Sequence, residues 1–489
     1  MDYNVEDLCA IVEERQPTFT EEQSTIFHTI MSAVTEGTEL LAFIDARGGC
    51  GKTYLLNTIL SAVRSMDGGS TALAMATTGI AANLLSLGRT FHSRLKAPLV
   101  PKPESTLNIT AQSNLAKLVR GCKMMLIDES TMLDRYMLEA LDRTLRDLLD
   151  NEKPFGGKII ILAGDFRQCL PVVPGASRPE TVQHCINQSS LWSHFKIMKL
   201  TVNMRIHASG DRVLQEFDDW SLSIGNGERK SIRLPENYVT VRVKTNSLSD
   251  SNSEGKAMQD FCDQVFPDIG QNIDNPRWLE GRALLATTNK EVNMLNDTLQ
   301  EKLPGSTDKL SSADTLENSE DLLRFNQEYL NTLNPTGFPT HVLKLKKGMP
   351  LMLMRNLNPR EGLCNGTKLI YLRTIDSKVL ECQIVETLRT VLIPRITFIP
   401  KDGEYPFEWQ RRQFPVKPAF ATTINKSQGQ TLKMAGVWLR TQVFAHGQLY
   451  VACSRVGKPD GIKFAVITDQ SGDIENVDNV VFNEVLLNE

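Results

Sequence analysis

The chain has 489 residues, of which 41% are hydrophobic and 23% charged; this is the composition of an ordinary globular protein, and the length requires more than one domain. A formal net charge of -4 excludes a surface that is basic throughout, so any contact with nucleic acid would be confined to a groove. The nine cysteines occur singly and no apolar run is long enough to span a bilayer, so the sequence predicts a soluble protein of a reducing, intracellular compartment, with no membrane partner, structural zinc or iron–sulfur cluster.

Residues 1–36 have the pattern of amphipathic helices interrupted at Pro17. Thr20 stands at a helix N-cap and Gln23 follows three residues later, which is the spacing of a capping box. Gln23 has a second interpretation, because its amide offers both the donor and the acceptor that the edge of adenine requires. The spacing alone favours the cap.

Residues 41–57 combine an apolar run, a glycine-rich turn and the start of a helical pattern. Backbone N–H groups in such a turn can converge on a phosphate chain, and the helix adds the positive end of its dipole. Ala46 stands where the full G-x-x-x-x-G-K-[ST] pattern has its first glycine, and the alternative is a turn that binds nothing. The pattern predicts that Lys52 reaches the β- and γ-phosphates and that Thr53 holds Mg²⁺. The predicted nucleotide contacts of this loop are Gly48, Gly49, Cys50, Gly51, Lys52, Thr53 and Tyr54.

Three further apolar stretches, within residues 71–82, 124–129 and 159–165, are separated by helical patterns and predict parallel strands. Ligands bind at the carboxyl ends of such strands, so Asp128, Glu129 and Asp165 should converge on the phosphate loop. Asp128 is predicted to hold Mg²⁺ through water, and Glu129 to orient and deprotonate the attacking water. The alternative is an ordinary acidic strand end, but the pairing with an upstream phosphate loop favours nucleotide hydrolysis.

Three polar residues are candidates for contact with the γ-phosphate. Gln168 follows the strand near residue 160 and presents an amide that can sense this group. Arg205 and Arg455 can place planar donors at the charge that spreads over the transition state of phosphoryl transfer. An isolated arginine is more often a surface ion pair, so these two are selected because of the motifs around them.

The second half of the chain changes character. A second lobe is predicted to begin near residue 206, and residues 278–289 have the pattern of a strand followed by a turn and a helix. Residues 304–340 are rich in Ser, Asp, Asn, Pro and Gly, which predicts a long irregular excursion. Short alternating apolar runs between residues 342 and 398 predict a small β-barrel or sandwich inserted in this lobe.

Seven motifs follow one another along the chain. They are the phosphate loop, residues 77–82 (TTGIAA), residues 128–130 (DES), residues 164–168 (GDFRQ), Arg205, residues 422–431 (TTINKSQGQT) and residues 450–455 (YVACSR). This ordered set resembles the superfamily 1B helicases, and most of all the petite-integration-frequency (PIF-type) DNA helicases, over nearly the whole chain. Residues 357–367 resemble the branch found in eukaryotic genomes and Helitron transposons.

The resemblance implies an α/β fold with two RecA-like P-loop lobes built on parallel sheets. A small wedge would be inserted in lobe one and a Src-homology-3-like β-barrel in lobe two. The implied parts are an N-terminal segment (1–19), lobe one (20–204) with the wedge near 94–114, the first part of lobe two (205–354), the barrel (355–413) and the second part of lobe two (414–489).

The same resemblance implies a monomeric motor that uses ATP and Mg²⁺ to move 5′→3′ along single-stranded DNA and to unwind forked or tailed duplexes. Roles in DNA repair, recombination and telomere maintenance, and a nuclear location in a eukaryote, would follow. The implied catalytic residues are Lys52, Glu129, Gln168, Arg205 and Arg455, with Gln23 on adenine. The implied DNA-binding residues are Thr77, Thr78, Gly79, Phe91, His92, Ser93, Thr423, Asn425, Lys426 and Ser427. Hydroxyls, amides and one lysine suit phosphates, and aromatic rings can stack on any base.

Two alternatives stay open. One is a nucleotide-gated DNA-binding or transposition subunit that clamps a strand without unwinding it. The other is an RNA-directed helicase, because motifs that contact phosphates do not distinguish the two nucleic acids.

Overall fold

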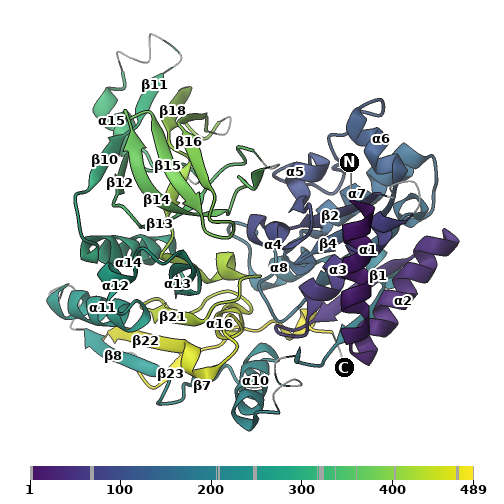
Figure 1. Cartoon of the computed structure of the whole chain (residues 1–489), viewed down its shortest axis with the longest axis horizontal. Helices are drawn as coiled ribbons and strands as arrows, with labels where there is room; N and C mark the ends of the chain where they lie inside the picture. The colour runs from purple at the N-terminus through teal and green to yellow at the C-terminus, as the bar shows by residue number, and fades with distance from the viewer. Residues whose placement is uncertain are drawn as a thin grey trace.

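The computed structural model describes residues 4–66, 71–204, 206, 210–245, 251–316, 318, 324–335, 337–358, 361–400, 403–469 and 473–487. Figure 1 shows two lobes side by side, with lobe one in purple and blue and lobe two in teal and yellow. A group of antiparallel strands lies above lobe two in this view. No helix among the described residues is long and apolar enough to cross a membrane.

Lobe one is a six-stranded sheet of order β3-β2-β4-β5-β1-β6 in which every pair is parallel. Its strands are β1 (Leu41–Ala46), β2 (Thr71–Ala76), β3 (Arg89–Thr90), β4 (Cys122–Asp128), β5 (Ile159–Gly164) and β6 (Lys196–Leu200). Its helices are α1 (Val5–Arg15), α2 (Glu21–Glu36), α3 (Lys52–Ser65), α4 (Gly79–Leu84), α5 (Phe91–Leu95), α6 (Asn114–Gly121), α7 (Arg135–Leu149) and α8 (Arg178–Gln183). The central strands are buried on both faces, as their continuous apolar runs predict.

The register of this sheet brings the predicted site residues to one edge. Asp45 pairs with Gly164 and Ala76 pairs with Asp128, so the loops that follow β1, β2, β4 and β5 start side by side. The phosphate loop, the acidic pair and the segment after β5 therefore meet at the carboxyl ends of neighbouring strands, where ligands bind in sheets of this kind.

Lobe two is built on a second parallel sheet, of order β20-β9-β21-β22-β8. Its segments before the insertion are α10 (Arg212–Gly225), β7 (Ser231–Arg233), β8 (Val239–Thr245), α11 (Ser251–Val265), α12 (Ile269–Asn272), α13 (Pro276–Glu280), β9 (Arg282–Ala286) and α14 (Asn289–Lys302). Its segments after the insertion are β20 (Ala421–Thr423), the 3-10 helix η8 (Ile424–Ser427), β21 (Met434–Leu439), α16 (Gln448–Cys453), β22 (Ile462–Asp469) and β23 (Asn476–Asp478). The insertion therefore leaves and re-enters one continuous sheet.

The inserted part contains a five-stranded antiparallel sheet of order β16-β15-β14-β13-β19 and a three-stranded sheet of order β11-β18-β17. A two-stranded pair joins β10 and β12. The elements are β10 (Asp308–Ser311), β11 (Ala313–Leu316), α15 (Gln327–Thr332), β12 (Val342–Leu345), β13 (Pro350–Leu353), β14 (Lys368–Ile375), β15 (Val379–Ile384), β16 (Thr390–Pro394), β17 (Ile396–Phe398), β18 (Trp409–Gln413) and β19 (Val416–Pro418).

The prediction that residues 304–340 are irregular is wrong in part, because they contain β10, β11 and α15. Asp314 on β11 forms a fully buried ion pair with Arg411 on β18, with 2.7 Å between Nη2 and Oδ2. Arg411 also donates to the carbonyl oxygens of Leu330 and Pro339 and so holds α15 and the segment that follows it. The strands β11 and β18 are far apart in the sequence, so their pairing produces no local sequence pattern. The composition of residues 304–340 therefore gave a wrong prediction for these elements.

The segment predicted as a wedge lies between α5 and α6. It has no helix or strand between Lys96 and Ser113, and its tip carries Leu99 and Val100, which are 72% and 69% exposed. The segment is held to α7 at Ser105, whose carbonyl oxygen accepts from Arg143. The exposed apolar residues therefore precede a point at which the chain is fixed.

The last described residues return from lobe two to lobe one. Phe482 and Val485 pack in the core of lobe one, and Asn187 donates to the carbonyl oxygen of Val485. Residues 480–487 therefore tie the two lobes together, and Figure 1 places the C-terminus beside lobe one.

Candidate active site

The phosphate loop connects β1 to α3 and has the backbone that its glycines allow. Gly49 and Gly51 have φ angles of +90° and +73°, a region that residues with a side chain rarely adopt. A Cβ atom on Gly51 would lie 2.5 Å from Nε2 of Gln23. Both the angle and the space therefore require glycine at this position.

Gln23, at the start of α2, contacts the backbone of the phosphate loop. The capping box at the start of α2 is confirmed, since the Thr20 hydroxyl accepts from the Gln23 N–H and Gln23 Oε1 accepts from the Thr20 N–H. The Gln23 Nε2 group donates to the carbonyl oxygen of Cys50 at 3.2 Å, and the side chain is only 1% exposed. Both ends of this amide are thus in use, and contact with adenine would require one of these bonds to be exchanged.

Lys52 bridges the two acidic residues that follow β4. Its Nζ atom lies 2.6 Å from Oδ1 of Asp128 and 3.1 Å from Oε1 of Glu129. Burial alone would raise the pKa of Glu129, but the Lys52 ammonium and the Gln428 amide outweigh burial and hold it below its ordinary value. Burial raises the pKa of Asp128 in spite of Lys52. Glu129 is therefore held as a carboxylate.

Glu129 also has an unusual backbone and a partner from lobe two. Its φ angle is +50°, in the left-handed region, where a residue other than glycine costs about 1 kcal/mol or more. Gln428, which follows η8, donates through Nε2 to Oε2 of Glu129 at 2.7 Å. The carboxylate is thus oriented from both sides of the boundary between the lobes.

Arg455 approaches the same place from the end of α16. It is 4% exposed and donates to the carbonyl oxygens of Val451 and Gln430, at 2.8 and 3.0 Å. Gln168 lies across from it, bonded through Nε2 to Asp165, while its Oε1 atom is buried without a partner among the described residues. A buried acceptor without a donor is costly and suits a site that is completed by a ligand.

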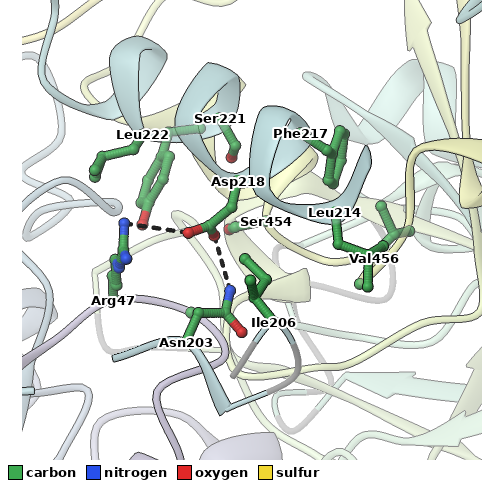
Figure 2. A pocket seen from close by; sticks show the side chains of 13 residues that line it. Arg47, Asn203, Ile206, Leu214, Phe217, Asp218, Ser221, Leu222, Ser454 and Val456 are labelled. Carbon is green, nitrogen blue, oxygen red and sulfur yellow. Dashed lines mark hydrogen bonds and ion pairs between the residues drawn. The ribbon is translucent and has the colours of Figure 1, made fainter. Parts of the chain in front are cut away.

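A second contact across the lobes lies beside the phosphate loop, in a cavity of about 30 Å³ (Figure 2). Figure 2 shows Asp218 of α10 between Arg47 and Asn203. Arg47 forms an ion pair with Asp218 at 3.2 Å and donates to the carbonyl oxygen of Thr201, and Asn203 donates to Asp218 at 2.9 Å. The phosphate loop is therefore fastened to lobe two in this arrangement.

These residues enclose a cavity of about 320 Å³ between the lobes. It is lined from lobe one by the phosphate loop, the acidic pair and Gln168, and from lobe two by residues 429–431, Ser454 and Arg455. The glycine turn, the helix N-terminus and Lys52 fit the phosphates of a nucleotide. Thr53 and Asp128 line the same cavity and offer the hard oxygen atoms that Mg²⁺ prefers.

A larger channel of about 1060 Å³ runs on the other side of this boundary. It is lined by lobe one, lobe two and strand β13 of the insertion, and none of its described lining residues is acidic. Its cationic side chains are Lys417, Lys426 and Arg178, the last of which is paired with Glu484. In a chain of net charge -4, a channel with this lining suits a polyanion.

Two connections join the channel to the acidic pair. Thr77 lines the channel, and its hydroxyl donates to the carbonyl oxygen of Glu129 at 2.9 Å, while its N–H donates to that of Asp128. Gln428, which bonds Glu129, lies two residues after Lys426 of the channel. A change at either site can therefore reach the other through one or two side chains.

Comparison with known families agrees with this geometry. A family model for the PIF1-like helicases matches residues 18–233, and a model for the 2B domain of the DNA helicase Pif1 matches residues 328–373. The first match contains the phosphate loop, the acidic pair and Gln168, and the second contains β12, β13 and part of β14. This chain belongs to the PIF1-like helicase family.

Relatives of this PIF1-like chain include the ATP-dependent DNA helicase PIF1 of Xenopus laevis, which is 26% identical over 464 residues. That alignment covers 92% of this chain and 61% of the relative. The human PIF1 helicase is 25% identical over 459 residues with the same two coverages. The ATP-dependent DNA helicase RRM3 of Saccharomyces cerevisiae is 23% identical, over 91% of this chain and 64% of the relative. The PIF1-like chain thus spans about three fifths of the length of these relatives.

Solved structures share its fold. Bacteroides Pif1 bound to single-stranded DNA has a TM-score of 0.65 at 22% identity, covering 96% of this chain and 94% of that one. Pif1 helicase from Candida albicans has a TM-score of 0.61 at 24% identity, covering 91% and 94%. These likenesses establish the fold of the PIF1-like chain, with two RecA-like lobes.

The structure brings most of the predicted site residues of the PIF1-like chain together, in two places. The nucleotide cavity is lined by Gly48, Gly49, Gly51, Lys52, Thr53, Tyr54, Asp128, Glu129, Gln168 and Arg455. The channel is lined by Thr77, Thr78, Gly79, His92, Thr423, Asn425 and Lys426. The sequence motifs thus identified residues that share two cavities.

Other predicted residues lie elsewhere. Phe91 is fully buried in the core of lobe one, and Ser427 is fully buried with its hydroxyl donating to Ile424. The Cys50 side chain is buried, and Ser93 is exposed beside a small cavity near Asn365. Arg205 lies outside the described residues.

Three residues of the sites were not identified from the sequence. Gln428 contacts Glu129, Lys417 lines the channel, and Phe444 lines the channel with 61% of its surface exposed. Gln428 lies within the recognised 422–431 motif, and Lys417 lies within residues 414–429, a longer stretch that also resembles the family; this was the available signal. Phe444 stands among apolar residues before α16 and resembles a core residue in sequence.

Proposed function

We propose that this chain is an ATP-dependent DNA helicase that moves 5′→3′ along single-stranded DNA and separates duplexes. The proposal rests above all on one observation, that a nucleotide cavity with groups from both lobes is joined through Thr77 and Gln428 to a channel with no acidic lining residue among those described. The relatives are DNA helicases by name, and a structure of the same fold holds single-stranded DNA, which agrees with this function.

In this proposal the chain's own groups act on ATP as follows. Lys52 exchanges its carboxylate partners for oxygens of the β- and γ-phosphates. Glu129, ionised at neutral pH, orients the attacking water and accepts its proton. Arg455 and Gln168 contact the γ-phosphate region, and Arg205 is assigned to it as well. Thr53 and Asp128 would hold Mg²⁺, which when bound neutralises charge on the phosphates.

Movement would follow from the position of these groups on two lobes. With the γ-phosphate present, Lys52 and Arg455 are both drawn to it and the cleft is closed. Its loss on hydrolysis removes the shared anion, and the cleft relaxes. Because Thr77 and Lys426 grip the strand from opposite lobes, each cycle would shift one grip relative to the other. One chain supplies all of these groups, so a monomer suffices.

The strand would be held mainly through its phosphates. Thr77, Thr78, Thr423 and Lys426 offer donors that do not read sequence. Phe444 offers an exposed ring on which any base can stack, a contact worth about 1–3 kcal/mol in other single-strand binders. Binding should therefore tolerate any sequence and weaken as salt rises.

The rate of ATP hydrolysis, measured with and without single-stranded DNA, tests the proposal. We expect strong stimulation by DNA and weak stimulation by RNA of the same sequence. An equal rate with and without DNA would favour a clamp that does not move, and equal stimulation by RNA would favour an RNA-directed helicase.

A further inference from the structure

Two lysines face each other in the channel without a carboxylate between them. Lys417 on β19 and Lys426 on η8 both line the channel, and they lie close enough for the charge of Lys426 to lower the pKa of Lys417. The ion pairs of the described residues include neither lysine. Two ammonium groups this close repel each other, so the fold holds an arrangement that a bound anion would relieve.

The backbone determines the face of the sheet from which the Lys417 side chain leaves. Lys417 pairs with Met352 on β13, and Met352 pairs with Lys368 on β14, so the three side chains leave the same face of the sheet. Met352 lines the channel, which identifies this face as the channel wall. Lys426 is fixed from the opposite side, because η8 follows directly from β20 in the sheet of lobe two.

We propose that Lys417 and Lys426 form a binding site for one phosphodiester group of the single strand, with one cation supplied by the insertion and one by lobe two. This inference rests on the proposed function, in that the channel holds a nucleic-acid strand. It gives a specific role to Lys417, which the sequence did not identify as a site residue.

The site should also take up a proton when the strand binds. Burial, and next the nearby Lys426 charge, lower the pKa of Lys417 to about 8. A phosphate between the lysines would raise the pKa of Lys417 again, so the strand favours its protonated form. A proton from solvent then binds to the Lys417 amine as the strand enters.

Several other titratable groups lie near Lys417. Burial also lowers the pKa of Lys368, in the same cross-strand row, although Glu280 on α13 opposes this effect. Burial lowers the pKa of His92 across the channel from 6.5, and burial raises that of Cys169 to about 12. Burial lowers the pKa of His446, also in the channel wall, to about 4. A pH effect on binding in this range is therefore assigned to Lys417 only if the Lys417 variants lose it.

The test is the affinity for a short fluorescein-labelled oligothymidylate, measured by anisotropy from pH 7 to pH 9 at constant ionic strength. For the unaltered chain we expect a loss of about fivefold between pH 7 and pH 9, which corresponds to a pKa one unit higher with the strand bound. Lys417→Met should bind more weakly at pH 7, show no loss towards pH 9 and reduce the salt slope by about 0.7. Lys417→Arg should keep its affinity at both pH values, because guanidinium does not titrate there. Lys123→Met, which alters an exposed lysine at the opposite end of β4, should behave as the unaltered chain.

The possible results separate the two proposals. If the unaltered chain binds the strand and Lys417→Met or Lys417→Arg loses affinity with pH as it does, the lysine site is wrong and the proposed function stands. If the unaltered chain does not bind the strand at any pH, the proposed function is wrong and the lysine site falls with it. If Lys417→Met does not fold, Lys417→Arg decides the question alone.

Discussion

Glu129 occupies a position in which several constraints meet. Its backbone is left-handed, its carboxylate is shared by Lys52 and Gln428, and its carbonyl oxygen accepts from Thr77. Unfavourable backbone angles persist only where the surroundings determine them, and they cluster at functional sites. The residue that is best placed to activate water is thus also the one that both lobes and the channel loop hold in place.

At this scale the first prediction concerns the carboxylate of Glu129. Glu129→Gln should bind ATP with nearly unchanged affinity but hydrolyse it about 10²- to 10⁴-fold more slowly, because the amide cannot accept the proton of water. Binding is measured with a fluorescent ATP analogue and turnover by phosphate release. Glu39→Gln, which alters an exposed residue far from the cleft, is the control. Normal turnover in Glu129→Gln would show that another group is the base.

The sequence identified Lys52, Asp128 and Glu129 because this chemistry needs these residue types directly after a strand, which is a local requirement. It left Gln23 between two interpretations, and the structure shows the cap together with a bond to the loop. It did not reveal Gln428 or Lys417, because their importance depends on what faces them in space. Residues that contact the other lobe do not stand at a characteristic sequence distance from their partners, so no motif identifies them.

Among the elements, the loop between β2 and α4 has a central place. It carries Thr77, which bonds the carbonyl of Glu129, and it ends at Gly79, which faces the turn at Asn365 in the insertion. A Cβ atom on Gly79 would overlap the carbonyl oxygen of Asn365. This one loop therefore touches the nucleotide site, the channel and the insertion.

The second prediction follows from this close approach. Gly79→Ala should push the insertion away from α4 and lower the rate of DNA-stimulated ATP hydrolysis by about 10- to 100-fold, since displacements of about 1 Å have such effects. Hydrolysis without DNA should change much less. Gly255→Ala, at an exposed helical glycine with open space around it, is the matched control. Equal stimulation in both variants would contradict the argument.

Parallel strands were predictable in lobe one because continuous apolar runs separated by helical patterns have few other interpretations. The helix and strands within residues 304–340 could not be predicted in this way. The strand β11 is formed by pairing with β18 and is held by the buried ion pair of Asp314 and Arg411. The polar composition of residues 304–340 could not reveal that β11 pairs with β18, which is far away in the sequence.

For the molecule as a whole, His446 is a principal link between the lobes. It lies just before α16, and its Nε2 atom is 2.7 Å from the carbonyl oxygen of Phe166 in lobe one. The N–H of Phe482, in the segment that returns to lobe one, donates to Nδ1 at 2.8 Å. The ring is therefore neutral with its proton on Nε2, and a second proton on Nδ1 would face an N–H group.

The third prediction is a pH dependence of stability. Burial lowers the pKa of His446 to about 4 in the folded state, against 6.5 for an ordinary histidine. Below pH 6.5 the unfolded chain binds the proton more readily, so the free energy of unfolding should fall by about 1.4 kcal/mol per pH unit from this residue down to about pH 4. Urea unfolding at pH 7 and pH 5 measures the slope. His446→Gln should show a smaller slope by that amount, and parallel curves for the two proteins would refute the role of His446.

The most direct test of the account is strand displacement with a duplex that carries a single-stranded tail at one end. We expect separation of a 5′-tailed duplex only when ATP is present, little separation of a 3′-tailed one, and no separation by Lys52→Ala, which should still bind the strand. Binding and ATP hydrolysis by the unaltered chain without displacement of either duplex would contradict the claim that the two lobes convert hydrolysis into movement along DNA.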